Sequence, residues 1–530
     1  MYTAKYLKLA WEKAGTPYRI RILEKLPTPY GLVRYGVAPD HPEVKNVQHD
    51  FQTLLEQQGP TTSTSSSIEY LGNVTVGRDI SLHELRQSHH AVVLATGCES
   101  DRTLDLPIAT GTSSSASSSA NDDNPPPPQK IPPDDNNHPS LKGILSAREF
   151  VAWYNGHPEY THIGPLVQDA LTTTTRPTSS SSSSSSSDDE STTTIREASV
   201  VVVGQGNVAL DCARILAKGG KGLYHTDMAA HALPVLGQGV RRISVVGRRG
   251  HVQGAFTIKE LRELVQLQEE GHDTDFVVRS DELDQGATPA SIDELEGPGG
   301  RPKKRIDKLL RKAAASSTAT SSSNKRLDLR FLLNPSAWQA DKDDSSRLGG
   351  VLCERTRLEG EAGEQQAVGT GEMEEIPAQL ALVSIGYKGL LMPGLEDRFF
   401  DADRGVVRHE HGRIDPSAVS ADDASIGGLY AAGWIKRGPS GIIGTNIPDA
   451  RDTVNTILQD LEDIQSPSNH EHTINDLKKL LTERGVEVVD WEAYRRIEAH
   501  EAASTRSDEQ PREKITNLQE QLDVALGRGR

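Results

Sequence analysis

Residues 199–220 carry the clearest chemical pattern in the chain, SVVVVGQGNVALDCARILAKGG. The apolar run 200–203 predicts a buried parallel strand, and residues 207–218 continue as a helix. The turn between them, which begins the pattern G-x-G-x-x-A, consists of Gly204, Gln205, Gly206 and Asn207. Gly204 permits a tight turn, Gly206 lets the backbone approach a pyrophosphate, and the helix N-terminus supplies oriented N–H groups. Since both strand and helix are present, we favour a dinucleotide site over a merely structural turn.

The next predicted strand, RRISVVGRRG at 241–250, indicates which dinucleotide is bound. An NAD site usually has an acidic residue at the end of this strand, where it binds the ribose hydroxyls. Here the strand ends in Arg248 and Arg249, whose guanidinium groups suit a 2′-phosphate. A solvated basic turn is the alternative. The pattern therefore favours NADP(H) over NAD(H).

The first residues predict the second half of another nucleotide-binding βαβ unit. Apolar residues recur at helical spacing over residues 1–14, and Gly15 and Pro17 follow as stop signals. Residues 18–24 then alternate as a strand that ends in Glu24. The strand and glycine turn that open such a unit are absent from this sequence. We therefore expect the chain to start at an internal methionine, or to come from a gene model that lacks its first exon.

The composition limits the classes of function. With 530 residues, two domains are expected, and a net charge of −17 argues against nucleic-acid binding. No run of 18 apolar residues occurs, so we expect no transmembrane helix. Cys98, Cys212 and Cys353 lie far apart, which fits a reducing compartment without disulfides. No metal site is indicated.

Low-complexity segments interrupt the chain at about residues 110–139, 172–194 and 313–324. They are rich in Ser, Thr, Pro, Asp or Ala, and we predict disordered loops inserted into a folded frame. Two segments, HHAVVLATG at 89–97 and ALVSIGY at 381–387, predict buried strands where the chain crosses between domains.

Several blocks together resemble the adrenodoxin reductase family, the mitochondrial-type NADPH:ferredoxin reductases. The blocks occur in order through nearly the whole chain, at residues 24–47, 72–79, 150–158, 204–216, 245–264, 383–388, 433–446 and, more weakly, 511–522. The resemblance implies an α/β fold of two Rossmann-like domains of the glutathione-reductase type. The FAD-binding domain would comprise residues 1–97 and 389–530, and the NADP-binding domain residues 98–388.

The resemblance also implies the cofactor contacts. Glu24 would bind the adenosine ribose of FAD, and the further FAD contacts would be Leu32, Val76, Trp434, Gly441, Ile442 and Ile443. Gly441 would also lie near the nicotinamide. The NADP contacts would be Gly204, Gln205, Gly206, Asn207, Arg248, Arg249 and Glu260. Taken alone, Trp434 also fits a core aromatic residue, and Glu260 a solvated helix residue.

His41 and Asp211 resemble polar positions close to the family's flavin, and we expect them to tune the flavin or handle protons. A hydrogen-bonded loop histidine is the alternative for His41. The resemblance implies electron transfer from NADPH through FAD to an acidic 2Fe-2S ferredoxin. Arg301 and Arg305, in the basic segment 300–312, resemble the family's docking arginines, although a solvated helix face fits the same pattern.

The family also implies a mitochondrial location and a monomer, and no presequence is visible. Two other functions fit parts of the sequence. A disulfide reductase would need a cysteine pair beside the flavin, which the sequence lacks. A truncated paralogue would bind NADP(H) without flavin and act as a sensor or scaffold.

Overall fold

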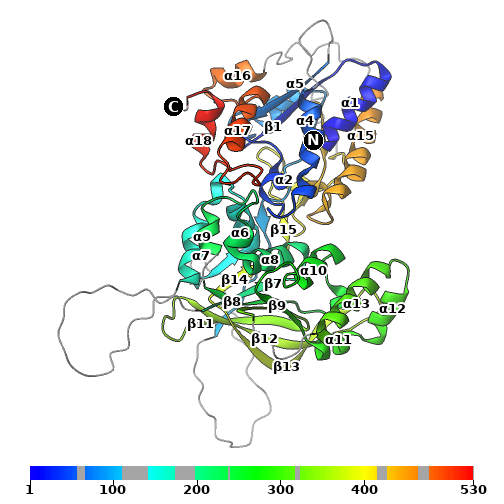
Figure 1. Cartoon of the computed structure of the whole chain (residues 1–530). Coiled ribbons are helices and arrows are strands. Elements are labelled where there is room, and N and C mark those ends of the chain that lie inside the picture. The colour runs from blue at the N-terminus through cyan, green and yellow to red at the C-terminus, as the bar shows by residue number, and fades with distance from the viewer. Residues whose placement is uncertain are drawn as a thin grey trace, which may run out of the picture.

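The computed structural model describes residues 1–56, 66–109, 141–172, 197–236, 239–316, 323–414, 427–463 and 477–528. The chain forms two α/β bodies, and the upper body in Figure 1 contains both ends of the chain. Most of the three low-complexity tracts lies outside the described residues. The prediction of a loop was wrong for residues 313–316, which complete helix α13 (Arg301–Ser316). Three of these four residues are alanine, the strongest helix former.

The lower body is built on a six-stranded parallel sheet. The strand order is β6 (Ile144–Ser146), β14 (Leu380–Val383), β7 (Ala198–Val203), β8 (Val240–Val246), β10 (Lys325–Arg330) and β9 (Thr274–Val278). The helices packed around this sheet are α6 (Ala147–Tyr154), α7 (Ile163–Leu171), α8 (Asn207–Gly222), α9 (Ala232–Leu236), α10 (Ile258–Val265), α11 (Ser280–Gly286), α12 (Pro289–Glu296) and α13.

A second sheet covers the other face of the parallel sheet. Its order is β13 (Gln366–Pro377), β12 (Leu348–Glu359), β11 (Leu333–Ala340) and β5 (Ile108–Ala109). Strand β7 shows why its sequence is apolar throughout. Val200 and Val202 pack into the core on the helical side, whereas Val201 and Val203 pack with Trp338 and Val351 of the second sheet. Both faces of the strand are therefore buried, as in α/β proteins generally.

The upper body contains two separate pairs of parallel strands. β1 (Arg19–Glu24) pairs with β2 (Ser67–Gly72), and β3 (Ala91–Leu94) pairs with β18 (Gly428–Ala431). Their helices are α1 (Tyr2–Ala14), α2 (Gly31–Tyr35), α3 (Pro42–Lys45), α4 (Val47–Glu56), α5 (Leu82–Ser88), α14 (Trp434–Arg437), α15 (Asn446–Asp463), α16 (Leu477–Glu483), α17 (Trp491–Ala503) and α18 (Leu518–Ala525).

The structure confirms several predicted elements and corrects one. α1 and β1 occur where predicted, and α1 packs against α15. α8 begins at Asn207 as predicted, and its first part ends at Lys218, also as predicted, because Gly219 is non-helical; a further short helical part continues to Gly222. The prediction of a buried strand at 89–97 was wrong for β3, in which only Leu94 is buried. One reason is that β3 pairs on one side only, with β18, within the described part of the chain.

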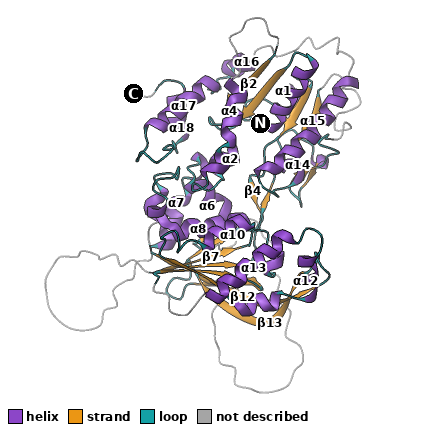
Figure 2. Ribbon diagram, turned by 45° about the vertical axis from the view of Figure 1, so that its right-hand side comes forward, coloured by secondary structure: helices purple, strands orange, loops and turns teal. Residues whose placement is uncertain are grey.

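The chain crosses between the two bodies through two short strands. β4 (Ser100–Asp101) and β15 (Tyr387–Lys388) pair antiparallel. β4 lies between the two bodies in Figure 2. β15 leads on to the hairpin of β16 (Phe400–Asp401) and β17 (Val406–Val407) in the upper body. None of the described helices is long and apolar enough to cross a membrane, as predicted.

Candidate active site

The turn after β7 has the geometry that its glycines predict. Gly204 has φ of 129°, and a Cβ atom there would lie 2.1 Å from the Ser384 carbonyl oxygen. Only glycine fits so close to the end of β14. At Gly206, by contrast, a Cβ atom would meet nothing within 4 Å. The turn thus packs tightly on the side of the sheet and is open at Gly206, which leaves room for a ligand's phosphates.

The turn lies at the point where the chain order of the sheet reverses, because β8 flanks β7 on one side and β14 on the other. Its two polar side chains bond within the protein. Gln205 donates from Nε2 to the Arg330 carbonyl oxygen at 2.6 Å, and Asn207 Oδ1 accepts from the Thr257 N–H at 2.9 Å. These bonds fix the turn, so its backbone is the part that can face a dinucleotide.

Arg248 and Arg249 follow β8 with fixed backbones and exposed side chains. The Arg248 carbonyl oxygen accepts from Thr356 Oγ1 at 2.7 Å, and that of Arg249 accepts from the Leu332 N–H at 3.2 Å. Neither guanidinium group has a partner among the described residues. Two cations beside the glycine turn therefore remain available to a phosphate.

His41 and Asp211 come together through two residues that the sequence analysis did not single out. His41 Nε2 lies 2.7 Å from Glu263 Oε2, and the fully buried Arg214 binds both Glu263, at 3.0 Å, and Asp211, at 2.7 Å. His41 is buried, as a hydrogen-bonded loop histidine would also be. Burial raises the pKa of Asp211 despite the opposing charge of Arg214.

Glu260 lies one helical turn from this cluster, at the start of α10. Its carboxylate accepts from the Thr257 hydroxyl group. Burial raises the pKa of Glu260, and the charge of Asp211 adds to this effect. Glu260 is therefore half-buried in an acidic environment rather than a simple solvated helix residue.

Glu24 ends β1 as predicted. Its Oε1 accepts from the Leu26 N–H at 3.3 Å, and burial raises its pKa to about 7. The Val74 N–H donates to the Glu24 carbonyl oxygen at 2.9 Å, which brings the segment containing Val76 beside the strand end. Leu32 is 42% exposed on α2. A carboxyl group at this position suits ribose hydroxyls.

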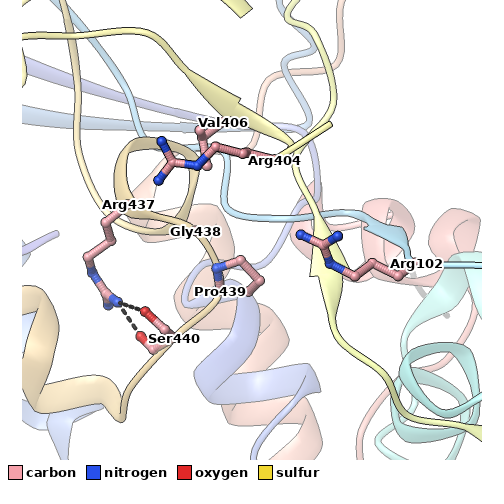
Figure 3. A pocket seen from close by; sticks show the side chains of 7 residues that line it. All are labelled: Arg102, Arg404, Val406, Arg437, Gly438, Pro439 and Ser440. Carbon is pink, nitrogen blue, oxygen red and sulfur yellow. Dashed lines mark hydrogen bonds between the residues drawn. The ribbon is translucent and has the colours of Figure 1, made fainter. Parts of the chain in front are cut away.

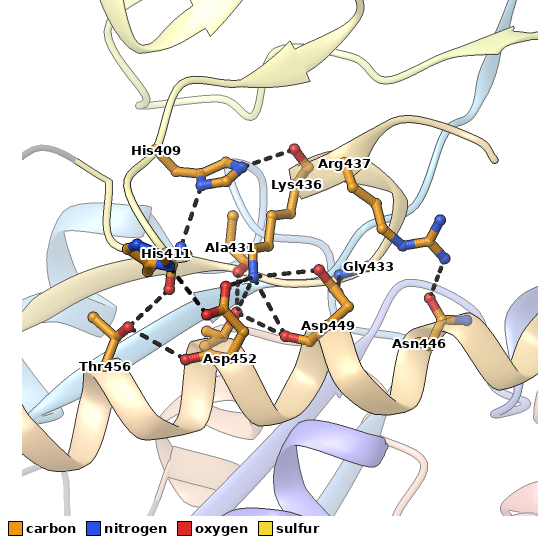
Figure 4. A network of polar contacts seen from close by, with 12 residues as sticks. His409, His411, Ala431, Gly433, Lys436, Arg437, Asn446, Asp449, Asp452 and Thr456 are labelled. Atoms are coloured by element: carbon orange, nitrogen blue, oxygen red, sulfur yellow. Dashed lines mark hydrogen bonds and ion pairs between the residues drawn. The ribbon is translucent and has the colours of Figure 1, made fainter. Parts of the chain in front are cut away.

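A network of hydrogen bonds and ion pairs holds the short helix α14 against α15 (Figure 4). Buried Lys436 donates from Nζ to Asp452 Oδ2 at 2.8 Å and to Thr453 Oγ1 at 3.0 Å. Its ammonium group also lies 3.3 Å from Asp449 Oδ1, and Asp449 accepts from the Gly433 N–H. The first residue of α14, Trp434, is tilted against Tyr387 of β15, with ring centroids 6.0 Å apart.

The segment after α14 forms an exposed turn that leads into α15. Gly438 and Gly441 have φ of 85° and 82°, and Ile442 is 61% exposed. Ile443 opens a short 3₁₀ helix, Ile443–Thr445, and α15 begins at Asn446. The N-terminus of this long helix, with its partial positive charge, therefore follows directly on the turn.

The comparisons with known proteins identify the family. No protein-family model matches the chain. The mitochondrial NADPH:adrenodoxin oxidoreductase of Arabidopsis thaliana is 35% identical over 99% of this chain and 92% of that protein. The human protein of the same name is 36% identical over 98% of this chain and 89% of that protein. The chain belongs to the NADPH:adrenodoxin oxidoreductase family.

A bacterial NADPH-ferredoxin reductase has a similar fold. NADPH-ferredoxin reductase FprA of Mycobacterium tuberculosis is 33% identical over 99% of this chain and 96% of that protein. Its structure in complex with NADPH matches this chain with a TM-score of 0.76, at 32% identity, and covers 99% of this chain and 97% of that one. The predicted family and the two-domain Rossmann-like fold are thereby confirmed.

The three cysteines of this family member do not support a disulfide reductase. All three are free and buried, and no pair forms a disulfide. Burial raises the pKa of Cys98 to about 11 and that of Cys353 to about 12, so these thiols remain protonated near neutral pH.

The predicted docking arginines lie on α13. The side chains of Arg301 and Arg305 are exposed and have no partner among the described residues. Neighbouring cations on the same helix are paired: Lys304 with Glu296 at 2.6 Å, and Arg311 with Asp284 at 2.7 Å. Two arginines on α13 thus remain available to an acidic partner.

Proposed function

We propose that this chain transfers electrons from NADPH, through bound FAD, to a 2Fe-2S ferredoxin. The observation that carries the proposal is the glycine turn at Gly204 and Gly206 beside two exposed, unpartnered arginines, Arg248 and Arg249. This arrangement fits a dinucleotide with a 2′-phosphate. Relatives over nearly the full chain are named NADPH:adrenodoxin oxidoreductase and NADPH-ferredoxin reductase, which supports the same activity here.

The candidate site residues divide between two cofactors. Gly204, Gln205, Gly206, Asn207, Arg248, Arg249 and Glu260 would hold NADP(H), and Glu24, Leu32, Val76, Trp434, Gly441, Ile442 and Ile443 would hold FAD. FAD supplies the step from a two-electron hydride donor to a one-electron acceptor. The protein supplies position and charge: the N-terminus of α15 after the turn at Gly441 favours negative charge on a bound ring.

The cluster around Arg214 has a second role in the proposal. His41 and Asp211 handle protons or tune the flavin, and Glu263 positions the His41 ring through its hydrogen bond at 2.7 Å. The raised pKa of Asp211 fits a group that holds a proton closer to neutral pH than an ordinary carboxyl group does.

We also propose the following organisation. The FAD-binding domain comprises residues 1–97 and 389–530, and the NADP-binding domain residues 98–388, with the β4–β15 pair at the crossing between them. An acidic ferredoxin contacts Arg301 and Arg305. The eukaryotic relatives, whose names include the word mitochondrial, support a mitochondrial location, and we expect a monomer.

The test uses the purified full chain supplied with FAD and measures electron transfer by the absorbance of the flavin. Under anaerobic conditions NADPH should bleach the flavin absorbance, and addition of an acidic 2Fe-2S ferredoxin should restore it. A chain that binds NADPH but retains no flavin would favour a sensor or scaffold. A chain whose flavin is reduced by NADPH but not reoxidised by any ferredoxin would overturn the proposed acceptor.

A further inference from the structure

An open pocket of about 210 Å³ lies beside the turn that follows α14 (Figure 3). Its lining residues are Arg102, Arg404, Val406, Arg437, Gly438, Pro439 and Ser440. Three of the seven are arginines and none is acidic. Residues 437–440 belong to the block 433–446 singled out in the sequence, but that block did not indicate a pocket, because the other two arginines lie far away in the chain.

Three separate segments contribute the arginines. Arg102 follows β4 at the crossing between the two bodies, Arg404 lies in the β16–β17 hairpin, and Arg437 ends α14. Figure 3 shows their side chains arranged around Gly438 and Pro439. Gly438, with φ of 85°, lets the chain turn sharply at the base of the pocket.

The three guanidinium groups are not equivalent. Arg437 is committed to the turn, since its Nη2 donates to Thr445 Oγ1 at 2.8 Å and to Asn446 Oδ1 at 2.9 Å. The side chains of Arg102 and Arg404 are exposed and have no partner among the described residues. The pocket therefore presents two unpaired cations and one that already has partners.

Acidic residues close to these arginines in sequence include Asp101, Asp401 and the exposed Asp403, and none of these three pairs with the Arg102 or Arg404 guanidinium group. Asp101 Oδ2 accepts from Arg148 Nε at 3.0 Å, and Asp401 Oδ1 accepts from the backbone N–H of Arg404 at 3.0 Å. Neither contact pairs a carboxylate with the Arg102 or Arg404 guanidinium group. The charge of the pocket remains positive, in a chain whose net charge is −17.

We propose that this arginine pocket binds a carboxylate side chain of the acidic acceptor protein. The inference rests on the proposed function, because it places the partner's contact beside the turn at Gly441. The volume of about 210 Å³ lies below the roughly 300–1,000 Å³ typical of cofactor pockets. A carboxylate fits this space, and guanidinium groups bind it in a two-pronged geometry.

The position explains what such a contact would achieve. Ser440 lines the pocket, and the exposed Ile442 lies two residues further along the same turn. A protein that places a carboxylate in the pocket therefore rests against the turn proposed to hold the flavin. The pocket is a second contact, distinct from Arg301 and Arg305, and its residues 437–440 adjoin the turn at Gly441.

The test uses the FAD-loaded full chain with the double variant R102E/R404E. We expect the KM for an acidic 2Fe-2S ferredoxin to rise about tenfold or more, and the dependence of kcat/KM on ionic strength to become shallower. The rate with menadione, an uncharged quinone that needs no docking site, should stay within about twofold of wild type. The matched control is R242E/K342E, which makes the same charge change at two exposed positions away from the pocket.

Three results would overturn the inference. The KM for ferredoxin could stay at the wild-type value in R102E/R404E. It could also rise equally in R102E/R404E and in the control, which would show an effect of net charge alone. The menadione rate could fall in parallel with the ferredoxin rate, which would assign the arginines to the reductase's own cofactors. A wild-type chain that reduces menadione but no ferredoxin would instead contradict the proposed function, so the two failures are distinguishable.

Discussion

Arg214 on α8 holds Asp40 in a two-pronged ion pair, with Nε–Oδ2 and Nη2–Oδ1 distances of 2.9 Å. Asp40 belongs to the upper body and Arg214 to the lower one, so this pair joins them next to His41. Burial alone would raise the pKa of Asp40, but Arg214 holds it well below its ordinary value. Because Arg214 also binds Asp211 and Glu263, one buried guanidinium group fixes the whole cluster.

Loss of one member of this pair should be costly. Asp40→Asn removes the two-pronged ion pair but leaves Arg214 its contacts with Asp211 and Glu263, so we expect the free energy of unfolding to fall by about 1.5–3 kcal/mol. Urea unfolding measures this change. The control is Arg311→Met, which breaks the exposed contacts with Asp284 and Asp307 and should cost at most about 1 kcal/mol. Equal costs in the two variants would contradict a joining role for the pair.

Arg248 and Arg249 should set the preference for NADPH over NADH. Replacing either by Ala removes a charged contact to the 2′-phosphate worth about 1.5–3 kcal/mol, so the KM for NADPH should rise about 10- to 100-fold. The kcat/KM for NADH should hardly change. Arg242→Ala, at the other end of β8, is the matched control. A parallel loss with both coenzymes would show that the arginines do not recognise the phosphate.

Gly441 should tolerate no side chain, whereas Gly444 should. At Gly441, φ is 82° and a Cβ atom would lie 2.7 Å from the Thr445 side chain, while at Gly444 it would meet nothing within 4 Å. Gly441→Ala should therefore destabilise the turn by about 1–2 kcal/mol and weaken FAD retention, and Gly444→Ala should not. Thermal unfolding with and without FAD tests both effects. Identical behaviour of the two variants would remove Gly441 from the proposed flavin site.

The sequence was most informative where the candidate site residues are close to one another in the chain. The turn from Gly204 to Asn207, the arginines after β8 and the acid at the end of β1 were all predicted, because strand, turn and helix periodicity place them directly. The helix over residues 1–14 was predicted for the same reason. The family resemblance added candidate site residues that periodicity does not indicate, such as Glu260.

Contacts between distant segments were beyond such reasoning. Asp40 and Arg214 are 174 positions apart, and His41 and Glu263 are 222 apart. The one available signal was the spacing of Asp211 and Arg214, which places both on one face of a helix. The pocket of Arg102, Arg404 and Arg437 has no signal in sequence, because these arginines come from three separate segments that only the fold brings together.

A buried lysine predicts an unusual dependence of stability on pH. The Asp227 carboxylate forms ion pairs with the ammonium groups of Lys45, at 2.6 Å, and Lys514, at 3.2 Å. Lys514 is only 4% exposed. Burial lowers the pKa of Lys514 to about 7, although Asp227 opposes this effect. The unfolded chain keeps the ordinary lysine value, 10.5. Between about pH 7 and pH 10.5 the unfolded state binds more protons than the folded state, so the free energy of unfolding rises with pH.

Replacing Lys514 with Met should remove this contribution. Relative to Lys514→Met, the wild-type chain should gain about 2 kcal/mol of unfolding free energy between about pH 6 and pH 9. Urea unfolding of both chains across this range measures the difference. Lys342→Met, at an exposed position, is the control and should run parallel to wild type. A Lys514→Met curve that is also parallel to wild type would show that Lys514 stays protonated in the fold, held by its contact with Asp227.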